Sequence, residues 1–242
     1  VFDITDPAEP VFLKSLPASP VEVHTVLVDG ERLYAMSPDA GREVLLFDIT
    51  KPLEPVLLNR YTPQGAKELG YPHDAFAYEG RLYINFWGLG YLITDVTDPL
   101  NFQPLGRYTY LRQTSHANAV GTLAGRTIAF EGGEGYDAHL RVLDVTDPAR
   151  VGKIAEWRLR PQSSIHNMLL VGTRLYIAHY HEGVRVLDVS DPAQPRQLAY
   201  FNTFRETDFE RGYGFYEGAI GIRVPGDGYV YVVDTSRGLM IF

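Results

Sequence analysis

The sequence predicts an all-β protein, a five-bladed β-propeller of four-stranded antiparallel blades, and three observations predict it. First, the spacing between copies of one motif, 44 to 49 residues from one opening aspartate to the next, is typical of propellers and other repeat folds. Second, each interval holds four short β-forming runs and no credible helix. Third, the chain ends at the same point of the repeat at which it begins. The motif reads FDITDP (2–7), FDITKP (47–52), TDVTDP (94–99), LDVTDP (143–148) and LDVSDP (187–192).

The best-formed copy, residues 163–201, shows how one unit folds. Its four runs read HNMLLV, RLYIAHY, VRVLDVS and RQLAYF, and Gly-containing or Asp-Pro turns separate them. Runs rich in Val, Ile, Leu and Tyr between such turns are typical of hairpins. The motif aspartates Asp3, Asp48, Asp95, Asp144 and Asp188 precede a turn and are therefore interpreted as turn caps rather than catalytic groups.

We expect one propeller domain over residues 1–242, closed by its N-terminal strand. Aligning Gly238 with Gly183 places Phe242 at the position that Phe2 holds in the first motif. The strand at 11–16 would then complete the last blade and remove an exposed sheet edge. An alternative is a fragment of a six- or seven-bladed ring. The expected blades span approximately 17–61, 62–108, 109–159, 160–201, and 202–242 plus 1–16.

Composition excludes several classes of function. The net charge of −8 argues against nucleic-acid binding, which needs a basic surface. The absence of cysteine excludes thiolate catalysis, cysteine metal sites and disulfides. No apolar run is long enough to span a membrane. No signal peptide is present at Val1, and the chain starts inside a motif, so we interpret it as part of a longer precursor.

The units resemble the LVIVD repeat, named for the strand that reads VRVLDVSDP here. The C-terminal third, with IHNMLLVGTRLYIAHYHEGVRVLDVSDP and YEGAIGIRVPGDGYVYVVDTSRGLMIF, is similar to the choice-of-anchor B surface-protein family. This resemblance implies a propeller and an extracytoplasmic location, secreted or at a bacterial cell surface. It implies no particular reaction.

A histidine opens the first strand of four units: His24, His73, His116 and His166. In the fifth unit, FYEGAIG places Glu217 or Gly218 near this position. The first strand of a blade is innermost, so equivalent positions form a ring at one mouth of the central channel. Four imidazoles and one carboxylate suit a transition metal (Fe, Zn, Cu, Ni or Mn) better than Ca or Mg. The alternative is structural, with each histidine bonding the backbone of a neighbouring blade.

Further polar groups are expected at the same rim, on turns between second and third strands. His179, His181, Glu131 and Glu134 are secondary candidates for ligands or acid–base groups, with solvated turn residues as the alternative. The long connection 202–218 carries five aromatic residues that would either cover the site or pack into a groove between blades. The segment KELGYPH before His73 is a second candidate lid.

Three functions remain open from the sequence. The first is a metal-binding propeller, for which oxidoreductase or hydrolase activity is one outcome. The second is a non-catalytic surface scaffold that binds a protein or a glycan. The third is a glycosidase-like enzyme, which needs paired carboxylates; Asp74, Glu131 and Glu217 are the available set, and no spacing argument supports them. A small molecule is the partner expected of the first function.

Overall fold

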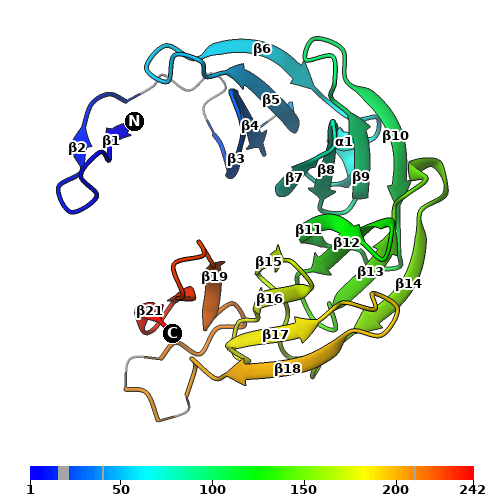
Figure 1. Cartoon of the computed structure of the whole chain (residues 1–242). Coiled ribbons are helices and arrows are strands. Elements are labelled where there is room, and N and C mark those ends of the chain that lie inside the picture. The colour runs from blue at the N-terminus through cyan, green and yellow to red at the C-terminus, as the bar shows by residue number, and fades with distance from the viewer. Residues whose placement is uncertain (16–21, 40, 206, 210) are drawn as a thin grey trace.

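A computed structural model gives the fold, and it describes residues 1–15, 22–39, 41–205, 207–209 and 211–242. The structure confirms an all-β propeller. Five sheets follow one another around an arc, and their first strands face its centre (Figure 1). Residue 16 of the predicted N-terminal strand and residues 17–21 of the predicted first blade lie outside the described residues.

Four sheets have four strands in meander order, each strand antiparallel to the next. The first sheet contains β3 (Thr25–Asp29), β4 (Arg32–Ser37), β5 (Glu43–Asp48) and β6 (Val56–Tyr61). The second contains β7 (Asp74–Tyr78), β8 (Arg81–Phe86), β9 (Gly90–Asp95) and β10 (Gln103–Tyr108). The third contains β11 (Ser115–Leu123), β12 (Arg126–Gly133), β13 (Leu140–Asp144) and β14 (Gly152–Trp157). The fourth contains β15 (Asn167–Val171), β16 (Arg174–Ala178), β17 (Val184–Asp188) and β18 (Arg196–Phe201).

The fifth sheet has three strands, β19 (Ala219–Arg223), β20 (Tyr231–Asp234) and β21 (Gly238–Ile241). The predicted closure differs from the structure here, because β2 (Val11–Phe12) pairs with β1 (Phe2–Asp3) and not with β21. The Asp-Pro turn joins β1 to β2 within a few residues, so this local pairing costs less loop-closure entropy than pairing with β21. The arc consequently stays open between β1–β2 and the fifth sheet (Figure 1).

The Asp-Pro turns behave as the sequence predicts. In each motif the carboxylate of the first aspartate accepts a hydrogen bond from the backbone N–H two residues later, as Asp95 Oδ1 does from Thr97 at 2.9 Å. This confirms the turn-capping role of the motif. The same bond occurs at Asp3, Asp48, Asp144 and Asp188.

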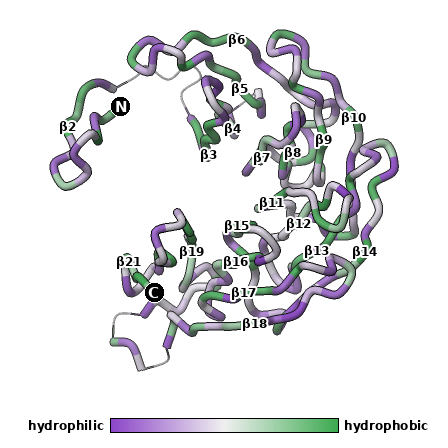
Figure 2. The backbone as a smooth tube through the Cα atoms, viewed as in Figure 1, coloured by the Kyte–Doolittle hydropathy of each residue, from purple (hydrophilic) through white to green (hydrophobic). Residues whose placement is uncertain are grey.

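The hydrophobic core lies between neighbouring blades. Separate clusters of buried side chains join the first sheet to the second, the second to the third, the third to the fourth and the fourth to the fifth. Hydrophobic stretches follow the strands in every blade (Figure 2). In the described residues two short helices interrupt this pattern, α1 (Ala66–Leu69) before β7 and the 3₁₀ turn η1 (Pro148–Arg150) after β13. No described helix has the length and apolar character needed to cross a membrane.

Candidate metal centre

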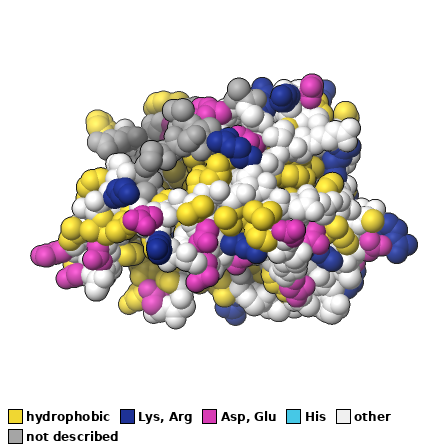
Figure 3. Space-filling view, turned by 90° about the horizontal axis from the view of Figure 1, so that it is seen from above, with side chains coloured by type: hydrophobic (Ala, Val, Ile, Leu, Met, Phe, Trp, Pro, Cys, Tyr) yellow, Lys and Arg dark blue, Asp and Glu magenta, His cyan; other side chains and the backbone are white. Residues whose placement is uncertain are grey.

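The structure brings the four predicted histidines into one row at the inner ends of the blades. The ring centroids of His24 and His73 are 4.1 Å apart, those of His73 and His116 are 3.9 Å apart, and those of His116 and His166 are 4.9 Å apart. None of these imidazoles is seen on the side of the molecule drawn in Figure 3, where apolar and charged side chains alternate. The repeat thus places one imidazole from each of the first four blades beside the next.

One backbone hydrogen bond explains the common position in three blades. The N–H of His24 donates to Met36 at 2.8 Å, that of His73 to Asn85 at 2.8 Å, and that of His166 to Ala178 at 3.0 Å. Each acceptor lies at or beside the end of the second strand, so each histidine extends the ladder of its first strand. His116 differs, because it sits in a bulge where the register between β11 and β12 shifts.

Burial makes the central imidazoles neutral at pH 7. His73 is 8% exposed and His116 is 2% exposed. Burial, reinforced by the neighbouring imidazoles, lowers the pKa of His73 to about 3 and holds the pKa of His116 well below its usual value. The Nδ1 atoms of both rings are buried and have no hydrogen-bond partner among the described residues. The neutral form of imidazole is the form that binds a metal ion.

Glu134, in the connection between β12 and β13, supplies a carboxylate. Its Oε1 lies 3.4 Å from Nε2 of His116 and accepts a hydrogen bond from the Tyr180 hydroxyl. One ligand atom from each of His73, His116 and Glu134 can be chosen so that all three lie within 4.8 Å of one another. Ligands at about 2.0–2.2 Å from a tetrahedral ion are roughly 3.3–3.6 Å apart, so this set is close to a metal-binding geometry. Burial raises the pKa of Glu134.

The two outer histidines extend this set. Nε2 of His24 lies 2.8 Å from Nε2 of His73, so one of these nitrogens donates and the other accepts when no ion is present. Nδ1 of His166 is in hydrogen-bonding contact with the carbonyl of Ile220, so Nδ1 carries the ring proton. The lone pair of Nε2 is then free to bind a metal ion. Burial lowers the pKa of His166. His24, unlike the others, is exposed.

Aromatic side chains line the rim. Tyr71 and Trp87 stack with centroids 5.8 Å apart, Trp87 stacks on His73 at 5.5 Å, and the Tyr180 ring meets that of His166 at 5.2 Å. Trp87 and Tyr180 both have positive φ, 31° and 37°, in turns between second and third strands. A positive φ is strained for a bulky residue and is often found at functional sites. Each of these two residues also forms a backbone bridge to the first strand of the next blade.

All four histidines line a cavity of about 480 Å³. Its polar lining includes Asp74, Asn118, Asn167 and Arg223, and the rest is mostly aliphatic. Burial raises the pKa of Asp74 to about 7, although the nearby Arg223 opposes this shift. The volume is within the range of small-molecule sites.

The remaining candidates lie in other surroundings. Glu217, predicted for the fifth position of the ring, packs against Gly212. Glu131 is fully buried and pairs with Arg141 at 3.2 Å while it accepts a hydrogen bond from Tyr110 at 3.0 Å. The carboxylate that lies beside the row of histidines is therefore that of Glu134. The sequence offered no reason to prefer Glu134 over Glu131 as a ligand.

The two secondary histidine candidates also have partners of their own. Nδ1 of His179 lies 3.2 Å from the Ser163 hydroxyl, and His181 stacks on Phe204 and contacts the carbonyl of Gly214 through Nε2 at 2.9 Å. From the connection 202–218, Tyr216 reaches the site, with its ring centroid 5.7 Å from that of Tyr180. Phe209 is 100% exposed and covers nothing.

Comparisons with known proteins support the fold. The LVIVD repeat family model matches residues 167–203 and 219–242. No curated protein matches the sequence.

Solved propeller structures resemble most of the chain. A hypothetical selenium-binding protein from Sulfolobus tokodaii has a TM-score of 0.70 at 14% identity, with 97% of this chain and 64% of that chain covered. A protein from Lactobacillus plantarum has a TM-score of 0.67 at 16% identity, with 91% of this chain and 66% of that chain covered. The periplasmic gluconolactonase of Pseudomonas aeruginosa has a TM-score of 0.63 at 13% identity, with 88% of this chain and 63% of that chain covered. The chain thus spans less than two thirds of the length of each, and at these identities the likeness shows the fold alone.

Proposed function

We propose that this LVIVD-repeat propeller binds a transition metal ion through His73, His116 and Glu134, with His24 and His166 as further ligands, and that the ion serves a reaction of a small molecule in the channel. One observation carries the proposal: one ring nitrogen from each of two buried imidazoles and one carboxylate oxygen lie within 4.8 Å of one another. A buried set of this composition is typical of a transition-metal site.

The ligand chemistry narrows the metal. Imidazole nitrogen suits Zn, Cu, Fe and Ni, and a carboxylate adds Mn, whereas Ca and Mg prefer sites built from oxygen alone. Because the histidines have lowered pKa values, protons compete weakly for their nitrogens near neutral pH. The site should therefore hold its ion in mildly acidic solution as well as at pH 7.

The arrangement suits a metal-dependent oxidoreductase or hydrolase. His73, His116 and Glu134 alone would leave several coordination positions open, and all five ligands would still leave one position of a six-coordinate ion. A bound ion would supply Lewis acidity or lower the pKa of a water molecule. The Tyr180 hydroxyl orients Glu134, and the Ile220 carbonyl fixes the tautomer of His166. The substrate would enter from the channel, where Asn118, Asn167 and the aliphatic lining can position it. We place this activity outside the cytoplasm, on the resemblance of the repeats to surface proteins.

Metal analysis of the protein purified without added metal tests the proposal. We expect about one equivalent of a transition metal in the wild-type protein. His116→Ala and Glu134→Gln should each weaken binding at least tenfold in a titration of the metal-free protein, since each removes or neutralises one ligand. His181→Ala is the matched control, because this histidine packs on Phe204 instead. Less than a tenth of an equivalent, together with no binding in the titration, would overturn the proposal.

A non-catalytic surface scaffold is the second candidate. The apolar side chains exposed on β2 and β21 favour it: Phe12 is 57% exposed and Leu239 is 63% exposed. Exposed apolar surface of this kind often marks an interaction site. This function predicts that changing all four ring histidines to alanine leaves partner binding intact, whereas a metal-dependent activity would be lost.

A further inference from the structure

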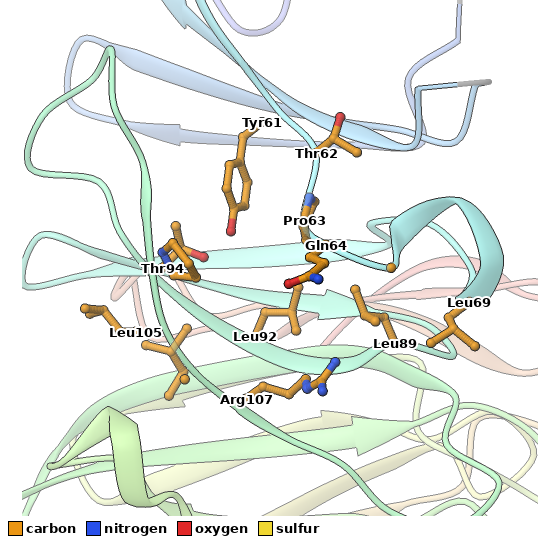
Figure 4. Close-up of a pocket in the computed structure, with 14 residues that line it drawn as sticks. Tyr61, Thr62, Pro63, Gln64, Leu69, Leu89, Leu92, Thr94, Leu105 and Arg107 are labelled. Carbon is orange, nitrogen blue, oxygen red and sulfur yellow. The ribbon is translucent and has the colours of Figure 1, made fainter.

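A groove between the first and second blades lies apart from the histidine ring. Its volume is about 750 Å³, and it runs between the end of β6, the segment that leads into α1, and the outer strands β9 and β10. Four leucines give it an apolar wall: Leu69, Leu89, Leu92 and Leu105. Figure 4 shows these side chains around the opening, with Arg107 beside Leu92 and with Tyr61 pointing towards Thr94 at the inner end.

Arg107 is the only charged residue that lines the groove in the part of the chain that the structure describes. It lies on β10 directly opposite Leu92 of β9. Its guanidinium takes part in none of the hydrogen bonds or ion pairs found among the described residues. An arginine that has an apolar wall on one side and no ion pair with a described carboxylate is suited to bind an anion.

In the first and third blades the equivalent position is paired. In the first blade the equivalent Arg60 bonds Glu43 at 2.6 Å. In the third blade the equivalent Glu156 lies 3.6 Å from His139, which occupies the place of Glu43. The second blade has Gly90 at that place, so Arg107 lacks the partner that its repeat neighbours have.

Polar side chains also line the groove. Oγ1 of Thr94 is buried, and the Tyr61 phenol points towards it (Figure 4). The amide of Gln64 faces the same space. The groove thus combines an apolar body, polar groups at its inner end and one cation at its rim.

We propose that this groove is a binding site for a small amphiphilic carboxylate, with its alkyl or aryl body against the four leucines and its carboxylate on Arg107. The chemistry of the lining selects this class: leucine side chains exclude a wholly polar ligand, and the lone guanidinium excludes a cation. A cavity of this size accommodates a molecule of eight to ten heavy atoms with room to spare. The site is independent of the proposed metal centre.

Isothermal titration calorimetry with octanoate tests this site, with octan-1-ol and octyltrimethylammonium as probes of the same chain length. We expect octanoate to bind one site at millimolar concentration or below. Arg107→Gln should weaken octanoate at least tenfold, because a charge-assisted contact is lost, and the alcohol and the cation should bind at least tenfold more weakly than octanoate to the wild-type protein. Arg196→Gln is the control, because it also removes one positive charge. Arg196 pairs with Asp188 on the surface of another blade and should not affect octanoate binding.

A second variant covers the case in which Arg107→Gln disturbs the fold, which circular dichroism would reveal. Leu69→Asp places a negative charge at the half-exposed mouth of the groove and should abolish octanoate binding. The proposal fails if octanoate does not bind at 5 mM, if octan-1-ol binds as tightly as octanoate, or if the folded groove variants bind like the wild-type protein. Metal content should be the same in all of these proteins, so the result does not depend on the metal centre.

Discussion

His116 and His24 hold the same position in the repeat but differ in surroundings. His116 is 2% exposed between two other imidazoles and a carboxylate, whereas His24 is exposed at the open end of the row. His179, outside the row, is also buried, and burial lowers its pKa to about 4. The same residue type therefore serves as a candidate ligand in one place and as a packed polar group in another.

The buried His179 should make the stability of the protein depend on pH. Its folded pKa of about 4 is below the ordinary value of 6.5, so the unfolded chain takes up a proton first as the pH falls. The free energy of unfolding should therefore fall between about pH 6.5 and pH 4, with about 2 kcal/mol lost at pH 5 from this group alone. Urea unfolding measures the free energy of unfolding at pH 7.5 and at pH 5. The decrease between these two pH values should be smaller in His179→Gln than in the wild-type protein by about 2 kcal/mol. Equal losses in the two proteins would contradict the assignment.

The sequence predicts the histidines of the site better than its carboxylate. The four histidines recur at one point of a repeat, and symmetry alone brings such residues together. Glu134 has no equivalent in the other blades, and only the strand register decides that Glu131 turns to Arg141 while Glu134 reaches His116. In the fifth unit the chain presents the carbonyl of Ile220 to His166, a backbone contact that side-chain patterns do not reveal.

At the scale of the element, the outer strand of each complete blade contains the same irregularity. The pairing of third and fourth strands shifts by one residue at Leu58, Leu105, Ile154 and Leu198. Such bulges bend a strand and increase its twist. In the second blade the bulge brings Gly106 so close to the next blade that an added Cβ would lie 1.7 Å from the carbonyl oxygen of Pro148.

Gly106→Ala should therefore destabilise the protein strongly. The methyl group would meet backbone rather than a movable side chain, so we expect a loss of about 2–3 kcal/mol or more in the free energy of unfolding. Gly152→Ala is the matched control, because Gly152 begins the equivalent strand of the third blade and has no atom within 4 Å of an added Cβ. Chemical denaturation should show a change of less than about 0.5 kcal/mol for that control. Similar losses in both variants would show that the contact with η1 is unimportant.

At the scale of the whole molecule, stability is unevenly distributed. The clusters between blades hold the five sheets together, whereas residues 2–15 of the β1–β2 hairpin are all exposed. A two-stranded hairpin without a packed face is marginal in water. The hairpin should therefore open far more readily than the central sheets.

Hydrogen–deuterium exchange followed by mass spectrometry should show this difference. We expect amides of residues 1–15 to exchange at nearly the rate of an unfolded chain, and those of β12 and β13 to be protected by several orders of magnitude. Protection of the hairpin equal to that of β12 would contradict the expectation. It would instead favour the closed ring in which the N-terminal strand completes the last blade.

The blades could be predicted from sequence, and the closure of the ring could not. Five copies of the Asp-Pro motif with β-forming runs between them specify strand order locally, as residues 163–201 illustrate. Closure depends on whether Val11–Phe12 pairs with nearby Phe2–Asp3 or with distant β21. Both pairings satisfy the same pattern, and loop-closure entropy, which the repeat does not encode, separates them.

The row of histidines has a mechanical consequence in a chain without cysteine. His24 and His73 are 49 residues apart and belong to neighbouring blades. An ion held by ligands from successive blades would act as a cross-link, closing long loops as a disulfide does. At a free metal concentration one hundred times the Kd, this cross-link would add about 2.7 kcal/mol to the free energy of unfolding. The ion would then link the inner ends of blades that otherwise contact only their neighbours. Removal of the ion would lower the stability of the propeller, first at the inner strands.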